Sequence, residues 1–178
     1  MLTATYSIVA LKVEQKKARW NLSALQHTIM TSLKNLKTAS GLDVESILNR
    51  LTQFEQYCHQ RKMEIFVIPA LRKITHEADT LLEELDSLSS RSLAILRSLR
   101  EKLQEAMRQG ALKIDELCAS LELCCAHLYR RLTKEDELVR IAERVIPSDE
   151  WFGIAAKFMT HDANVSKAAN QVRRALCN

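Results

Sequence analysis

Two groups of cysteine and histidine residues in this chain carry side chains that bind zinc in other proteins. Cys124, Cys125 and His127 lie close together in one segment, and Cys58 and His59 are adjacent in another. Thiolate and imidazole groups are the usual ligands of structural zinc. However, neighbouring cysteines on a helix project about 100° apart, so they rarely hold one ion. Zinc therefore stands as an alternative to the simpler interpretation, in which the cysteines are buried as small apolar residues.

A second set of polar residues interrupts or flanks apolar stripes. Gln15 lies in a helical stripe that is otherwise apolar, and Arg131 and Glu135 flank the stripe of a later segment, one helical turn apart. Because a charge is buried only when it is paired and hydrogen-bonded, we expect Arg131 and Glu135 to form an inward ion pair. Gln15 and His59 are most simply ordinary side chains that each bond one neighbour.

Four long amphipathic segments are expected to position these residues. Their apolar side chains recur at alternating steps of three and four residues, which is the spacing of one helix face. The first segment ends at Ser40-Gly41, the second near Pro69, the third at Gly110 and the fourth before Pro147. Four such helices with short connections predict an all-α, up-down-up-down four-helix bundle over about residues 5–146.

The stripes that define these helices are mainly leucine and isoleucine. In chain order they are Ile8, Leu11, Gln15, Ala18, Leu22, Leu25, Ile29, Leu33 and Leu36; Val44, Ile47, Leu51, Phe54, Cys58 and Ile65; Leu81, Leu85, Leu88, Ser92, Leu96, Leu99 and Leu103; and Ile114, Leu117, Leu121, Cys124, Leu128, Leu132, Leu138 and Ala142.

A shorter helix is expected after the bundle. Ser148 is placed to cap it, and Asp149 and Glu150 are favourable in its first turn. We expect this helix over about residues 148–160 and a tail over 161–178. The whole chain of 178 residues, with three glycines and two prolines, then forms a single helical domain.

Two segments resemble parts of hemerythrin-like (HHE) domains. The segment from Cys58-His59 to Pro69-Ala70-Leu71 is similar to the family's second helix, and Lys134-Glu135 to Ala142-Glu143-Arg144, closed by Pro147 to Trp151, is similar to its last bundle helix. In that family each segment carries a His-x-x-x-Glu pair that feeds a di-iron centre. Weaker similarities occur at Glu14-Gln15 and at Glu84-Leu85-Asp86, so the resemblance extends over roughly residues 5–160.

The resemblance implies ligand positions that this chain fills with other residues. Gln15 and Leu85 stand where the first and third helices place histidine. For the second and fourth helices the two ends of each motif differ by one residue. The resulting pairs are His59 and Met63 or Cys58 and Lys62, and then Arg131 and Glu135 or Arg130 and Lys134.

The residue types at these positions argue against iron binding. A guanidinium keeps its proton in a protein and repels a cation, and a leucine side chain offers no lone pair. In either register, at most one histidine and one carboxylate remain. The resemblance thus implies a degenerate member of the family, for which we expect no metal and no other cofactor. It also implies that Gln15, opposite, and His59, nearby, join Arg131 and Glu135 in a hydrogen-bonded network at the former metal cavity.

Composition excludes several other classes of function. Basic and acidic residues are interleaved and the net charge is +4, so the sequence predicts no nucleic-acid footprint. We expect neither a signal peptide nor a membrane span, and five cysteines without a framework pattern indicate reduced thiols in a cytoplasmic protein. No nucleophile with a base and no phosphate-binding glycine loop occurs, so we expect no enzyme.

The sequence therefore predicts a metal-free interaction or regulatory module, whose partner is a protein or a small molecule. A small molecule or anion bound at the former metal cavity is one form of that prediction. One alternative is a protein that binds iron in an altered site and senses or handles oxygen, nitric oxide or peroxide. The other is a structural bundle that acts as a homo-oligomer, with a homodimer as the simplest case.

Overall fold

The structure of the chain is a computed structural model that describes residues 2–34, 41–109 and 114–176. Every regular element in this part of the chain is a helix. The elements are α1 (Leu2–Lys34), α2 (Gly41–His59), the π-helix η1 (Met63–Val67), α3 (Ile68–Ile74), α4 (Asp79–Gln109), α5 (Ile114–Val145) and α6 (Ser148–Leu176).

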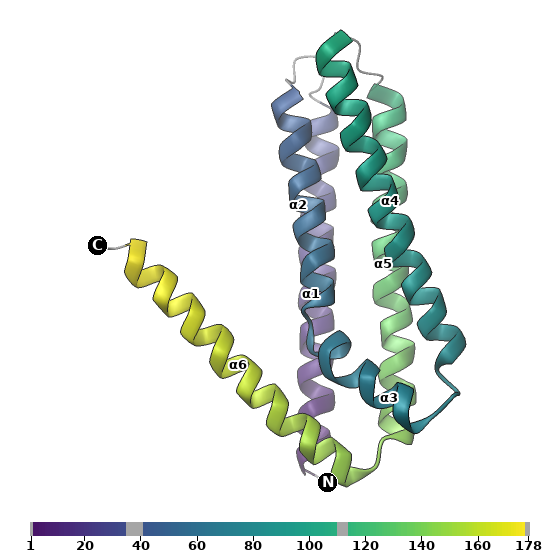
Figure 1. Cartoon of the computed structure of the whole chain (residues 1–178), viewed down its shortest axis with the longest axis vertical. Coiled ribbons are helices and arrows are strands. Elements are labelled where there is room, and N and C mark those ends of the chain that lie inside the picture. Colours follow the sequence, from purple (N-terminus) through teal and green to yellow (C-terminus); the bar gives the residue numbers. More distant parts are fainter. Residues whose placement is uncertain (1, 35–40, 110–113, 177–178) are drawn as a thin grey trace.

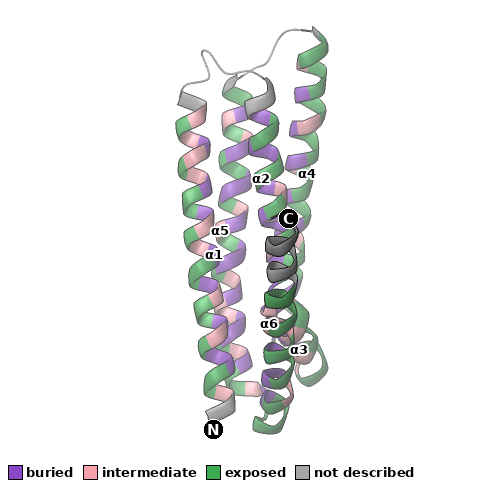
Figure 2. Cartoon of the chain, turned by 90° about the vertical axis from the view of Figure 1, so that its left-hand side faces the viewer, coloured by how far each residue is buried: buried purple, intermediate pink, exposed green. Residues whose placement is uncertain are grey.

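Three long helices, α1, α4 and α5, and the shorter α2 create the body of the molecule. Figure 1 shows α1, α2, α4 and α5 running lengthwise beside one another, while α3 lies near the end where α1 begins. Helix α4 packs against α5 and α2, and α1 packs against α5, α2 and α6. Figure 2 shows that buried residues line the inner faces of these helices. No helix in the described ranges is long and apolar enough to cross a membrane.

The core consists of two apolar clusters with polar residues between them along the helices. One cluster contains Ala18 of α1 and Leu132 of α5, and the other contains Leu11 of α1 and Leu138 of α5. Three buried polar residues lie where the two clusters meet. Gln15 lies between Leu11 and Ala18 in α1, and Glu135 lies between Leu132 and Leu138 in α5, with Arg131 one turn before it. A polar layer therefore divides the apolar core.

The second predicted helix is interrupted, which corrects the expectation that it runs to about Pro69. Helix α2 ends at His59, and the chain then enters the π-helix η1 before α3 begins at Ile68. Pro69 lies in the first turn of α3, where its missing N–H removes no intrahelical bond. It therefore starts a helix here. Beyond the interruption, Ile65 is 40% exposed and does not continue the buried stripe of α2.

The last helix is much longer than expected. We predicted a helix near residues 148–160 and a tail, whereas α6 continues to Leu176. After Gly153 the sequence of α6 contains no glycine or proline, so no residue favours an earlier end. A smaller difference concerns α4, where Leu82 is buried and Leu81 is only partly buried. The predicted stripe residues Leu33, Leu36 and Ile114 have side chains outside the described part.

Candidate functional site: a buried layer of arginine and glutamate

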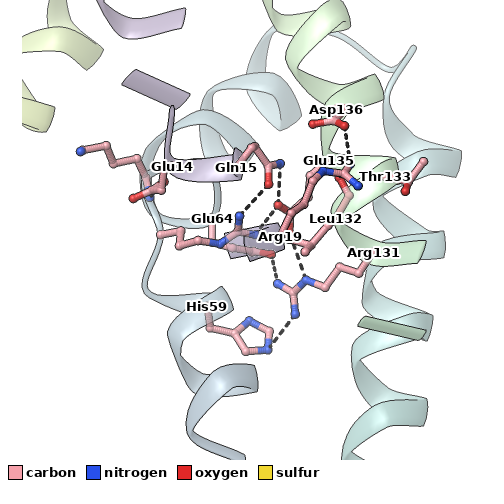
Figure 3. A network of polar contacts seen from close by, with 12 residues as sticks. Glu14, Gln15, Arg19, His59, Glu64, Arg131, Leu132, Thr133, Glu135 and Asp136 are labelled. Carbon is pink, nitrogen blue, oxygen red and sulfur yellow. Dashed lines mark hydrogen bonds and ion pairs between the residues drawn. The ribbon is translucent and has the colours of Figure 1, made fainter. Parts of the chain in front are cut away.

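The expected ion pair between Arg131 and Glu135 is present at the centre of the polar layer. Arg131 Nε donates a hydrogen bond to Glu135 Oε1 at 3.2 Å, one turn along α5. The side chains are 1% and 0% exposed. Both point toward the neighbouring helices in Figure 3. The alternative register is excluded as the inward one, because Arg130 is exposed and pairs with Glu84 at the surface.

Arg131 has further hydrogen-bond partners besides Glu135. Its Nη1 donates to Glu55 Oε1 of α2 at 3.1 Å and to the hydroxyl of Ser89 on α4, and its Nη2 donates to Glu64 Oε1 of η1. His59 Nε2 lies 3.5 Å from the same Nη1. Each nitrogen of the guanidinium thus has an acceptor, and the acceptors come from four separate elements.

A second buried arginine, Arg61, completes the layer. Its Nη1 donates to Gln15 Oε1 at 2.8 Å, and its Nη2 donates to Glu135 Oε2. Gln15 Nε2 donates to the same Oε2 at 2.8 Å. Glu135 therefore accepts hydrogen bonds on both oxygens, from Arg131 on one and from Arg61 and Gln15 on the other.

The interruption after α2 brings Arg61 into the layer. Gln60 and Arg61 form a turn and a bend rather than helix, and η1 begins at Met63 after the helical Lys62. The side chain of Arg61 is 1% exposed, so this irregular segment supplies a charged group to the interior.

Burial and charge act against each other at the two guanidinium groups. Burial alone would lower the pKa of Arg61 and of Arg131, but the adjacent Glu135 and the other negative groups outweigh it, and both pKa values are raised. Both arginines therefore keep their charge inside the protein. Two atoms of the layer, Glu55 Oε2 and Arg61 Nε, are buried without a hydrogen-bond partner among the described residues.

The remaining predicted positions fall into three environments. Gln15 is buried in the network, and Met63 and Leu85 are 1% and 3% exposed in the apolar cluster next to it. His59 lies at the edge, with a side chain that is 47% exposed and 3.5 Å from Glu55. Lys134 is partly exposed and pairs with Glu84 at 3.3 Å. The structure thus brings together Gln15, Arg131 and Glu135, while His59 only borders the layer.

Sequence reasoning missed Arg61, Glu55, Glu64 and Ser89. Arg61 and Glu55 had a detectable signal, because each lies three or four residues from a stripe position of α2, namely Leu51 or Cys58. Their burial was not predicted, because charged residues are rarely fully buried. Glu64 had no such signal, since its orientation depends on the π-helix.

The residues of the layer do not fit the di-iron centre that the resemblance implies. Glu55, Glu64 and Glu135 are the carboxylates that would bind metal, and each is bonded to a guanidinium. A metal ion would have to displace these bonds beside two fixed positive charges. Across the described part of the chain, no group of three or more His, Cys, Asp or Glu residues is arranged to hold a metal ion.

The cysteines of the zinc alternative are packed as apolar residues. Cys58, Cys124 and Cys125 all belong to one apolar cluster. Burial raises the pKa of Cys58 and of Cys124 to about 12, and that of Cys125 to about 11. Zinc binds the thiolate, so this environment disfavours the required form. His127 is only partly buried, and its pKa is lowered by burial and by nearby Arg91 and Arg130.

No protein-family model, no curated protein and no solved structure matches this chain significantly.

Proposed function

We propose that this protein is a metal-free interaction or regulatory module built on an up-down-up-down helical bundle of the hemerythrin-like type. The described helices and their contacts support the bundle, and the polar layer contains Gln15, Arg131 and Glu135, three positions where the resemblance implies metal ligands. In this proposal the layer takes the structural place of a metal centre. It links α1, α2, η1, α4 and α5 through charge-assisted hydrogen bonds.

One observation carries the proposal: Arg131 is bonded to three carboxylates that come from α2, η1 and α5. An ion pair with this many partners holds the helices in one register and uses the acidic groups that a metal would need. The function is consequently expected at the surface of the bundle rather than at its centre.

The option of an anion bound at the centre receives less support. Arg131 has an acceptor at each nitrogen, and two nitrogens of Arg61 are bonded as well. The layer contains two guanidinium groups and three carboxylates, so its formal charge does not attract an anion. We therefore propose an interaction role without catalysis, and a cytoplasmic location with reduced thiols.

Metal analysis of the full chain tests the metal-free centre. Protein would be produced in iron-supplemented medium and also with added zinc, then assayed for both metals and for oxo-bridge absorption. The proposal predicts far less than one metal ion per chain. About two iron atoms per chain would favour the altered-site metalloprotein instead. A stable oligomer in light scattering, with no other partner, would favour the structural alternative.

A further inference from the structure

A groove lies between α1 and α6, where the two helices diverge. Figure 1 shows α6 leaning away from α1 toward its C-terminal end. The groove encloses about 510 Å³ and is lined on the α1 side by Tyr6, Val9 and Val13, on the α6 side by Val165, and at its floor by Tyr57. It is therefore an open and largely apolar channel along the outside of the bundle.

The α1 wall of the groove is a second apolar face of that helix. Tyr6, Val9 and Val13 follow one another at steps of three and four residues and are 44%, 53% and 63% exposed. Trp20, seven residues beyond Val13, extends the same face and is 72% exposed. The face that carries Leu11 is buried in the core. Helix α1 thus has two apolar faces, of which the described chain covers one.

The α6 wall is the open continuation of a packed interface. Trp151, Ile154 and Phe158 are buried, so the first turns of α6 are fixed to the bundle. Val165 follows Phe158 by two helical turns on the same face and is 55% exposed. The apolar face of α6 therefore extends past the point where the chain covers it, and it meets the exposed face of α1 across the groove.

The acidic groups of the groove are already bonded within the chain. Glu14 Oε2 accepts a hydrogen bond from the backbone N–H of Lys62 at 3.0 Å. Asp162 pairs with Lys62 Nζ at 2.8 Å. The Lys62 side chain also lies over the ring of Phe158, 5.6 Å from its centroid. These contacts fix the base of α6, and Lys62 offsets the charge of Asp162.

The basic groups beside the groove are not neutralised in this way. On the α1 side, Lys16 and Lys17 are exposed, and no carboxylate of the described residues pairs with them. By contrast, Lys12 pairs with Glu143. The α1 rim of the groove therefore carries two unpaired positive charges beside the apolar side chains of that wall.

We propose that the groove binds an amphipathic helix of a partner protein, with apolar residues at i, i+3 or i+4 and i+7 and with acidic residues on its flanks. This inference rests on the proposed interaction role and names its surface. The wall from Tyr6 to Lys17 is about 17 Å long at 1.5 Å per residue, which accommodates three turns of such a helix. Carboxylates on the flank that faces α1 would meet Lys16 and Lys17.

A second copy of this chain fits the groove less well. Beyond Asp162, the sequence of α6 contains Lys167, Arg173 and Arg174 and no acidic residue. An α6 helix from another copy would therefore bring more positive charge to a basic rim, and like charges disfavour such a contact.

The test uses the full chain and synthetic helices of about 16 residues as probes, enough for about four turns. Three peptides share one leucine stripe and differ only in flanking charge, which is acidic, neutral or basic. A fourth has the acidic composition with the stripe scrambled. Binding is measured by fluorescence anisotropy and located by NMR shift perturbation. We expect the acidic amphipathic peptide to bind best, to perturb Val9, Val13 and Val165, and to weaken as salt is raised.

Variants of the chain test where the peptide binds and which flanking charge it prefers. Val13→Glu should lower the affinity by about tenfold or more, because a charge would replace a buried methyl contact. Leu123→Glu, at a residue on α5 that is 50% exposed, is the matched control and should leave binding unchanged. Lys16→Glu combined with Lys17→Glu should shift the preference toward the basic peptide.

Several results would overturn the inference. They are an absence of binding by all four peptides, equal binding of the acidic and basic peptides, equal loss in Val13→Glu and Leu123→Glu, or a dimer that Val13→Glu dissociates. None of these would bear on the metal-free centre. Conversely, iron in the purified protein would contradict the proposed centre while leaving the groove result intact.

Discussion

Arg61 and Arg131 bind opposite oxygens of one buried carboxylate. Arg131 Nε donates to Glu135 Oε1, and Arg61 Nη2 donates to Oε2. The two guanidinium groups are thereby held in one layer although they come from segments that are 70 residues apart in numbering, residues 61 and 131. Their mutual repulsion is offset by Glu135 together with Glu55 and Glu64. The stability of the bundle should depend on each member of this layer.

Arg61→Met should destabilise the protein by about 3–5 kcal/mol, because it leaves Glu135 with one fewer cation and Gln15 without its donor. Arg130→Met is the matched control. Arg130 is exposed and pairs with Glu84, so its loss should cost about 0–1 kcal/mol. Both values are read from chemical denaturation. Equal effects of the two substitutions would show that Arg61 is not an essential part of the core.

Leu85→Ala should destabilise the protein by about 2–5 kcal/mol, since Leu85 is 3% exposed within the apolar cluster below the layer. Leu93→Ala, on the same helix at a side chain that is 42% exposed, should cost much less. Thermal or denaturant unfolding distinguishes the two variants. An unchanged midpoint for Leu85→Ala would mean that the leucine is not packed.

The buried thiols should react with alkylating reagents only when the protein opens. Burial raises the pKa of Cys58 and Cys124 to about 12, so the reactive thiolate is scarce at neutral pH. We expect labelling of Cys58, Cys124 and Cys125 to follow unfolding, whereas the partly exposed Cys118 is labelled in the native state. Peptide mass spectrometry after timed labelling measures each site. Rapid native labelling of Cys58 would contradict its burial.

Glu14→Gln should stabilise the protein at neutral pH. Burial raises the pKa of Glu14, and Lys62 and Arg61 offset this effect only in part. The folded state therefore holds the proton more tightly than the unfolded state, and the stability contributed by the protonated group is lost as the pH rises through the raised value. Glutamine can still accept the hydrogen bond from Lys62 N–H.

Thermal unfolding across acidic to neutral pH checks this prediction. The difference between Glu14→Gln and the parent should be largest at neutral pH and should shrink below the ordinary glutamate pKa of about 4.3. Glu137→Gln, at a side chain that is 41% exposed, serves as the control and should show little change. If the parent protein were more stable than Glu14→Gln at neutral pH, the predicted direction of this effect would be wrong.

Helical periodicity predicted the parts of this protein that depend on local sequence. The stripe of α5 placed Arg131 and Glu135 inward, and Gln15 followed from an apolar stripe in α1. The π-helix was not predictable in this way, because the apolar spacing that indicates an α-helix does not reveal five residues of π-helix after α2.

The long-range partners of the layer were beyond single-sequence reasoning. Glu55 and Glu64 are 76 and 67 residues from Arg131 in sequence, so no local spacing connects them. Periodicity assigns a residue to a face of its own helix, whereas partners depend on how the helices are packed. Helix α6 is longer than predicted, because no glycine or proline follows Phe158 to end it.

Arg131 and Glu135 belong to one buried network rather than to an isolated ion pair, and the proposed metal-free centre depends on this property. If they formed an isolated pair, replacing both by apolar residues would cost little. Here Arg131→Met also deprives Glu55 and Glu64 of a cation, and Glu135→Leu also deprives Arg61 of its carboxylate. The double variant should therefore remain clearly destabilised.

A double-mutant cycle on Arg131→Met and Glu135→Leu, read from denaturant midpoints, tests this claim most directly. We predict that each single substitution costs about 3–5 kcal/mol and that the two effects are not additive, with a coupling of about 0.5–3 kcal/mol. Two small and additive effects, each within about 1 kcal/mol as for an exposed pair, would place these side chains in solvent and contradict the account.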